Sequence, residues 1–112
     1  MKAKESQPLP AQSVAALADM VEYQAGSVVS RTLMSKPSGS VTLFSFDAGE
    51  SLSEHTAPFD AMVNILDGEA LVTIAGQPHT VRAGETIIMP AGRPHALQAV
   101  QRFKMLLIMI LS

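Results

Sequence analysis

The sequence predicts an all-β domain, and three features support that fold class. Four glycines, Gly68, Gly76, Gly84 and Gly92, recur every eight residues. The runs between them are short and rich in valine, isoleucine, leucine and threonine. An aspartate precedes Gly68, and a proline follows two residues after Gly76 and Gly92, as is common in turns. Regular turns between short β-branched runs are typical of a sandwich or barrel.

The N-terminal quarter of the chain differs from the rest. Residues 1–10 are polar and contain proline, which predicts a loose arm. Residues 11–22 place apolar side chains at helical spacing, which favours a short helix packed on the barrel, with an irregular surface segment as the alternative. We therefore expect an arm with a short helix over residues 1–27 and a barrel over residues 28–112, together forming a single domain.

The strands of the barrel are predicted from the apolar runs. Residues 67–68 suit a tight hairpin, so the runs on either side of them are expected to be two separate strands. The prolines at 78 and 94 are expected to interrupt pairing. The predicted strands are 28–34, 41–46, 61–66, 70–75, 79–82, 86–89 and 102–111.

Two of these strands are apolar on both faces. In the run 61–66, Val63 and Ile65 point to one side, and Met62 and Leu66 point to the other. The last strand has the same character, whereas a small barrel with one face in water should alternate cleanly. Because the short helix can cover only part of the outside, we expect a symmetric homodimer to cover the rest.

Composition excludes several functional classes. The chain is 47% hydrophobic and 16% charged with a net charge of −2, and its basic residues are scattered, which argues against nucleic-acid binding and a polybasic membrane anchor. It has no cysteine, so thiolate metal sites and cysteine nucleophiles are excluded. The polar N-terminus does not resemble a signal peptide, and no apolar run approaches the roughly 18 residues of a membrane span. A soluble cytoplasmic protein is expected.

Two segments, 49–68 and 84–95, carry a family resemblance. Together they resemble the two signature motifs of the cupin superfamily. The first motif is a glycine, a His-x-His pair, a glutamate and a second glycine, and the second is a glycine, Pro-x-Gly, a histidine and an asparagine. The residues that match are Gly49, His55, Gly68, Gly84, Pro90, Gly92 and His95. The resemblance implies a double-stranded jelly-roll barrel.

The departures from the motifs bear on function. The family's second histidine falls on Ala57, its glutamate on Ala61 and its terminal asparagine on Ala99, so the resemblance carries over only His55 and His95 as metal ligands. Strand parity puts His55 on the inner face together with Ala57, Ala61 and Val63. We expect a histidine at the mouth of an apolar pocket, which Met89 could also line.

A tightly held metal usually needs at least about three protein ligands. A third ligand would have to come from Asp60 or His79. Asp60 has the wrong strand parity and would face inward only through a bulge or irregular turn at residues 57–59, which Pro58 favours. His79 has an equally good interpretation as a surface histidine. The sequence therefore favours a module that binds a small molecule, or a weakly held divalent metal such as zinc, nickel, iron or manganese. A metal-dependent oxygenase, isomerase or decarboxylase is the alternative that the resemblance implies, and a stand-alone sensing barrel is a third.

Overall fold

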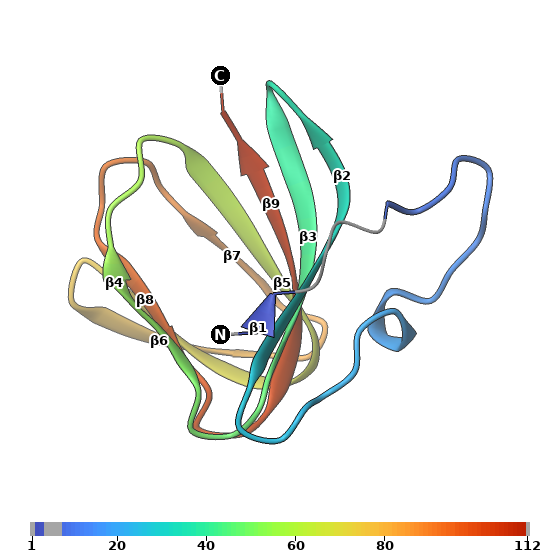
Figure 1. The fold of residues 1–112 in the computed structure, drawn as a ribbon. Helices are drawn as coiled ribbons and strands as arrows, with labels where there is room; N and C mark the ends of the chain where they lie inside the picture. Colours follow the sequence, from blue (N-terminus) through green and yellow to red (C-terminus); the bar gives the residue numbers. More distant parts are fainter. Residues whose placement is uncertain (1, 4–7, 112) are drawn as a thin grey trace.

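The computed structural model describes residues 2–3 and 8–111; the remainder of the predicted arm, residues 1 and 4–7, lies outside the described residues. The described chain forms a curled antiparallel sheet, open along one side, with the segment 8–26 lying outside it (Figure 1). Its strands are β1 (Lys2–Ala3), β2 (Val28–Lys36), β3 (Gly39–Phe46), β4 (Ser51–His55), β5 (Asp60–Ile74), β6 (Gln77–Arg82), β7 (Thr86–Met89), β8 (His95–Gln98) and β9 (Phe103–Ile110).

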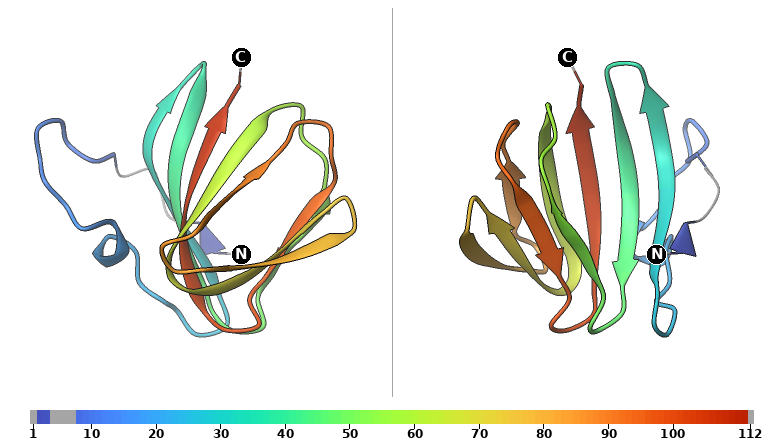
Figure 2. Two further views of the ribbon diagram at one scale, coloured as in Figure 1. Left: turned by 180° about the vertical axis from the view of Figure 1, so that it is seen from behind. Right: turned by 60° about the vertical axis from the view of Figure 1, so that its left-hand side comes forward.

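The strand order is β1-β2-β3-β9-β5-β8-β4, and β6 and β7 also pair with β5. All pairings are antiparallel except that of β1 with β2. One wall of the barrel consists of β2, β3, β9, β7 and the first half of β5, and the other of β4, β8, β6 and the second half of β5 (Figure 2). This is the predicted all-β jelly roll. No helix in the described part of the chain is long and apolar enough to cross a bilayer.

The barrel interior is filled by alternate side chains of these strands. Phe46 and Phe103 stack at its centre, with ring centroids 4.5 Å apart and planes inclined by 12°. Val63 and Ile65 point inward beside them and are fully buried, whereas Met62 and Leu66 lie on the outer face, as the alternation predicts. Burial of these large side chains supplies the main stabilisation of the fold.

The expected hairpin at residues 67–68 is wrong, because β5 continues through both residues as one strand of 15 residues. The register with β9 shifts between Ile65 and Asp67, and Gly68 adopts a φ of 75°. A glycine with positive φ serves a β-bulge as well as a hairpin, and here it bends the strand from one wall into the other. The tight turn lies instead at Ala75 and Gly76, both with positive φ, between β5 and β6.

Three other strands, β6, β4 and β8, differ from the expectation. β6 begins at Gln77 and contains Pro78, which is tolerated because β6 is paired only with β5 and its other edge is open. β4 and β8 were not predicted. The side chains of β4 are mostly exposed and give little apolar signal, and β8 has only four residues.

The short N-terminal helix is present only as a three-residue 3-10 turn, Leu17–Asp19. The segment around it is held by side chains that project from the outer face of the barrel wall. Lys104 Nζ donates to the carbonyl of Ala18 at 2.6 Å, Arg31 Nη1 to that of Met20 at 3.0 Å, and Ser45 Oγ to that of Glu22 at 2.7 Å. These bonds take up backbone carbonyls that a longer helix would have used internally.

Val21 of this segment packs against Val29 and Leu33 of β2 and Leu43 of β3, and the four form a second buried cluster on the outer face. Tyr23 lies at one end of the contact between the segment 8–26 and the barrel wall. Its hydroxyl donates to Asp67 at 2.5 Å, and the guanidinium of Arg102 lies 4.4 Å from its ring centroid. Burial, together with the Asp67 carboxylate, raises the pKa of Tyr23. The segment thus covers one part of the outer face and leaves the other part open.

The bend at Gly68 leads to a stability prediction. Gly84→Val places a β-branched residue at a φ of 88° with open space around it and should cost roughly 1–3 kcal/mol of unfolding free energy. Gly68→Val adds a collision between the new Cβ and the carbonyl oxygen of Arg102, so its loss should be the larger of the two. His55→Ala, at an exposed position, should cost least. Urea denaturation of the three variants measures the order, and equal losses at the two glycines would contradict the role given to Arg102.

Candidate functional site

Pairing of β4 with β8 places His55 directly opposite His95. The register of these two strands shifts between Leu52 and His55. Such an irregularity re-aims side chains at the end of a strand, and here it turns the two imidazole rings toward one another. The two motifs that contain these histidines are far apart in the sequence, so the site exists only because the barrel brings the strands together.

The two rings meet edge to face. Their Nε2 atoms lie 3.2 Å apart, their centroids are separated by 4.4 Å, and the ring planes are inclined by 73°. Nδ1 of His55 lies 3.0 Å from the carbonyl oxygen of Ser53. Because a carbonyl can only accept, this nitrogen carries a hydrogen, and Nε2 of the neutral His55 ring is left as an acceptor. The hydrogen between the two Nε2 atoms therefore belongs to His95.

His95 is the buried member of the pair, with 4% of its surface exposed. Its Nδ1 is buried without a hydrogen-bond partner among the described residues. Burial lowers the pKa of His95, the neighbouring His55 lowers it further, and the backbone of Arg93 opposes these effects. The backbone of Arg93 acts on His95 without a hydrogen bond of normal geometry, because Nδ1 of His95 has no hydrogen-bond partner among the described residues. The site thus favours a neutral His95.

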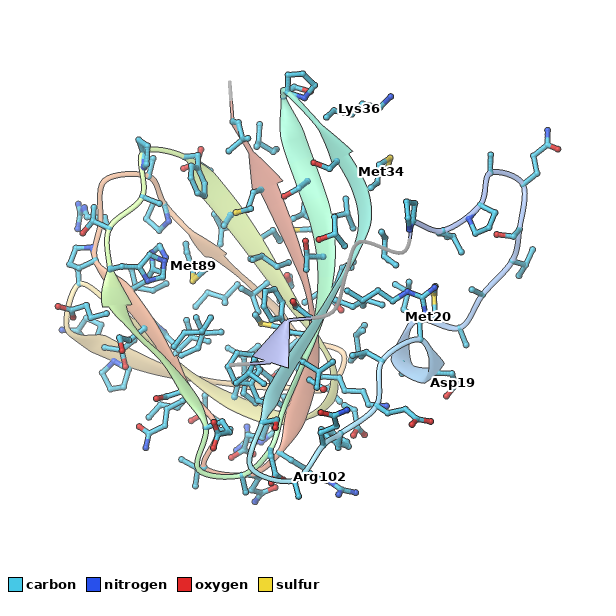
Figure 3. All side chains as sticks on the ribbon, in the orientation of Figure 1. Asp19, Met20, Met34, Lys36, Met89 and Arg102 are labelled. Atoms are coloured by element: carbon cyan, nitrogen blue, oxygen red, sulfur yellow. The ribbon has the colours of Figure 1, made fainter. Side chains whose placement is uncertain are left out.

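The histidine pair borders a small apolar cavity of about 70 Å³ inside the barrel. Met89 points from β7 into this space (Figure 3). Apart from the two imidazoles, the lining consists of apolar side chains contributed by both walls, namely Leu52, Phe59, Ala61, Met89, Leu97, Met105, Leu107 and Met109.

Of the predicted pocket residues, His55, Ala61, Met89 and His95 line this cavity. Val63 is fully buried in the core but does not border it. Ala57 is buried in the loop after β4, where its carbonyl accepts a hydrogen bond from the amide of Gly92 at 2.9 Å. Ala61 therefore borders the cavity, whereas Ala57 lies in the loop that follows His55, and neither supplies a ligand atom from its side chain.

The structure does not bring Asp60 or His79 to the pair. Asp60 lies on the outer face, and its Oδ1 accepts a hydrogen bond from the amide of Ala91 at 2.8 Å. His79 is exposed on β6, opposite Val72. Within residues 2–3 and 8–111, no three histidine, aspartate or glutamate side chains are grouped so as to hold a metal ion. The donor set that the structure assembles is the histidine pair alone.

Six lining residues were not predicted from the sequence. Met105, Leu107 and Met109 come from alternate positions of β9, and strand parity in the last apolar run contained the signal for them. Leu52 and Leu97 come from β4 and β8, the two strands that were missed. Phe59 lies in the loop before β5, where periodicity gives no information.

A curled antiparallel jelly roll with a histidine pair beside an apolar cavity defines a cupin-type barrel. The model of the cupin domain family matches residues 42–111, and the chain belongs to this family. The match includes both histidines and the whole cavity lining described above.

Solved structures agree with this assignment. A conserved protein of unknown function from Streptococcus pyogenes, SPY1581, is 38% identical, with a TM-score of 0.89 over 97% of this chain and 96% of its own. A cupin superfamily protein from Desulfitobacterium hafniense is 32% identical, with a TM-score of 0.88 over 97% and 100%. A cupin 2 conserved barrel domain protein from Leptotrichia buccalis is 48% identical, with a TM-score of 0.81 over 83% of this chain and 45% of that one. This chain thus spans less than half of the Leptotrichia protein, and no curated protein matches it.

Burial of His95 makes the stability of the protein depend on pH. Its pKa in the folded state is below the ordinary value of 6.5, so the unfolded chain binds more protons in the interval between the two values. The free energy of unfolding should therefore fall as the pH falls from 6.5 toward the folded-state pKa. Urea denaturation at about pH 7.5 and 5.5, with chelator present, should show a larger loss for the wild type than for His95→Gln. Equal losses would contradict a depressed pKa, which an NMR titration of the His95 ring measures directly.

Proposed function

We propose that this protein is a non-catalytic binding module for a small molecule, with the barrel cavity as its site. The observation that carries this proposal is the position of a two-histidine polar group at the border of an apolar cavity, with no third metal-ligating side chain beside it among residues 2–3 and 8–111. A few polar groups beside an apolar lining are the usual composition of ligand sites, where they fix orientation while burial provides affinity.

The size of the cavity limits the ligand. At about 70 Å³ it is smaller than the roughly 150 Å³ engineered apolar cavity that accommodates benzene. It suits a short aliphatic group of about three or four carbons, or the apolar end of a larger molecule that enters past the exposed His55. The methionines of the lining, Met89, Met105 and Met109, have flexible side chains that adjust to such a group.

The histidine pair determines which polar group the ligand carries. In its neutral form the pair shares one hydrogen between the two Nε2 atoms, so it has little to offer an acceptor. Uptake of one proton leaves an N–H on both Nε2 atoms, and two adjacent N–H groups match the two oxygens of a carboxylate. The ligand that fits is a small carboxylate with a short apolar tail, bound together with a proton.

A series of straight-chain carboxylates from acetate to hexanoate tests this proposal. Each methylene that enters the cavity should strengthen binding about fourfold, equivalent to ~0.8 kcal/mol, and the gain should stop once the cavity is full. We expect the rise to end near butyrate or pentanoate, where the tail fills the cavity. NMR titration of the two histidine rings measures the affinities.

The matched controls separate the two ends of the ligand. The corresponding alcohols lack the carboxylate and should bind more weakly at every chain length, whereas Ala61→Leu fills the cavity and should remove the dependence on chain length. A chain-length series that is flat in the wild type would refute the cavity as the site. Equal binding of alcohols and carboxylates would refute the role of the histidine pair.

One observation favours a second candidate, a weakly held divalent metal. Two metal–nitrogen bonds of about 2.1 Å that meet at an angle of about 100° put their nitrogens ~3.2 Å apart. The two Nε2 atoms have that separation, and the bond from His55 Nδ1 to Ser53 orients its Nε2 as metal-binding histidines require. The donor set still does not fit a tightly bound catalytic metal, because it supplies two protein ligands where such sites use three or more. His55 and His95 would hold the ion, and the oxygenase, isomerase or decarboxylase alternative would need a further ligand from its substrate.

Restoring ligands at the two alanine positions tests this candidate. The double substitution Ala57→His with Ala61→Glu should bind zinc at least about a hundredfold more tightly than the wild type, a gain of ~2.7 kcal/mol or more. The control, Ala57→His with Ala61→Gln, has the same shape without the carboxylate and should gain much less. Calorimetric titration after chelator treatment gives the affinities. A wild type that already binds zinc as tightly as the double variant would overturn the binding-module proposal and favour the enzyme.

A further inference from the structure

Part of the outer face of the barrel wall carries apolar side chains that no described segment covers. Met34, Ile88 and Ile110 are 55%, 61% and 57% exposed. Met34 and Lys36 project outward from β2 (Figure 3). Together with three half-buried neighbours, these apolar residues form what we call the open strip: Met34, Val41, Met62, Ile88, Ile108 and Ile110.

The open strip is one continuous band across five strands. Ile88 of β7 pairs with Met62 of β5, Met62 with Ile108 of β9, Ile108 with Val41 of β3, and Val41 with Met34 of β2. Directly paired residues in an antiparallel sheet lie on the same face, so this row presents apolar side chains only. The cluster under the segment 8–26 lies beside it, and Val41 belongs to both.

The next row of paired residues contains Ile110 of the open strip and has a charged residue at each end. Lys36 pairs with Gly39, Gly39 with Ile110, and Ile110 with Asp60. Around Gly39 the surface is hollowed to a volume of about 340 Å³, and between Met62, Ile88 and Ile110 to about 240 Å³. Residue 39 cannot fill the hollow around it with a side chain of its own, because a Cβ at Gly39 would collide with the carbonyl oxygen of Met109.

We propose that a second copy of this chain packs face to face on the open strip, related by a two-fold axis that runs along the strands between β3 and β9. This rotation reverses the order of the strands in the second copy, so that β2 faces β5 of the copy and β3 faces its β9. Lys36 then faces Asp60 of the second copy, and Ile110 sits over its Gly39, in the hollow that the glycine leaves. In the first row, Met34 faces Met62 and Val41 faces Ile108.

The charges select a second copy over other partners. The adjoining row carries one cation, Lys36, and one anion, Asp60, at its opposite ends, so the surface offers no net charge to a nucleic acid or an anionic lipid surface. Neither charge is paired within residues 2–3 and 8–111, where the ion pair that forms joins Arg82 to Glu69. A self-complementary surface is what a two-fold interface requires, because each patch meets its own copy.

The oligomeric state of the full chain tests the interface. Sedimentation at micromolar concentration should give about twice the 11.9 kDa mass of the chain. Ile110→Lys should raise the dissociation constant at least about tenfold, because the change occurs twice in a symmetric dimer. Val100→Lys is the matched control, since Val100 is 64% exposed but lies outside the strip, and it should leave the dimer intact. A monomeric wild type, or a dimer that only Val100→Lys weakens, would overturn the proposal.

The orientation has its own test. Lys36→Glu and Asp60→Lys should each weaken the dimer, and the double variant should recover it, because the charges again oppose one another. Asp60→Lys also removes the hydrogen bond to the Ala91 amide, but the double variant shares that loss, so recovery reports the pairing alone. A double variant as weak as the worse single variant would overturn the proposed axis. Circular dichroism of each variant establishes that its fold is retained.

Discussion

The close approach of β5 to β9 at Gly68 is the constraint on which the rest of the barrel depends. β5 pairs with four other strands, with β7 and β9 along its first half and β6 and β8 along its second. One strand can serve both walls only if it bends sharply, and the bend lies where a Cβ would collide with the carbonyl oxygen of Arg102. The position of β8 follows from the bend. His95 faces His55 because the second half of β5 holds β8 in register with β4.

Much of this fold follows from the amino-acid sequence, because the apolar runs report burial directly. Residues 86–89 form a strand with the predicted bounds, and the alternation in the run 61–66 identifies its inner and outer faces correctly. The strand boundary at Gly68 could not be predicted, because a positive φ is equally compatible with a hairpin and with a bulge. The approach of Arg102 that distinguishes the two is a contact between distant parts of the chain.

The candidate site was predictable only in part, for a related reason. The spacing of the motifs pointed to His55 and His95, which the fold brings together, whereas Asp60, a candidate third ligand, keeps the outward parity of its strand. The contact between the two rings depends on the irregularity in β4, a strand whose exposed side chains left almost no signal. His79 shares the inner face of its sheet with Val72, yet it is exposed, because β6 lies at the open edge of the barrel. Parity gives the face of a residue and not its depth.

The cavity and the open strip are two sides of one wall. Ala61 borders the cavity, and its neighbours in the chain, Asp60 and Met62, project to the opposite side, where they line an outer hollow. Met109 and Ile110 have the same relation in β9. Since packed sheets transmit displacement, a ligand that moves the backbone at Ala61 also moves the side chains that a second copy would contact. Such a ligand would change the dimer affinity only by as much as its own affinity differs between the free and paired barrels. Coupling of this kind would need no other route through the molecule, because the wall between the two surfaces is one sheet thick.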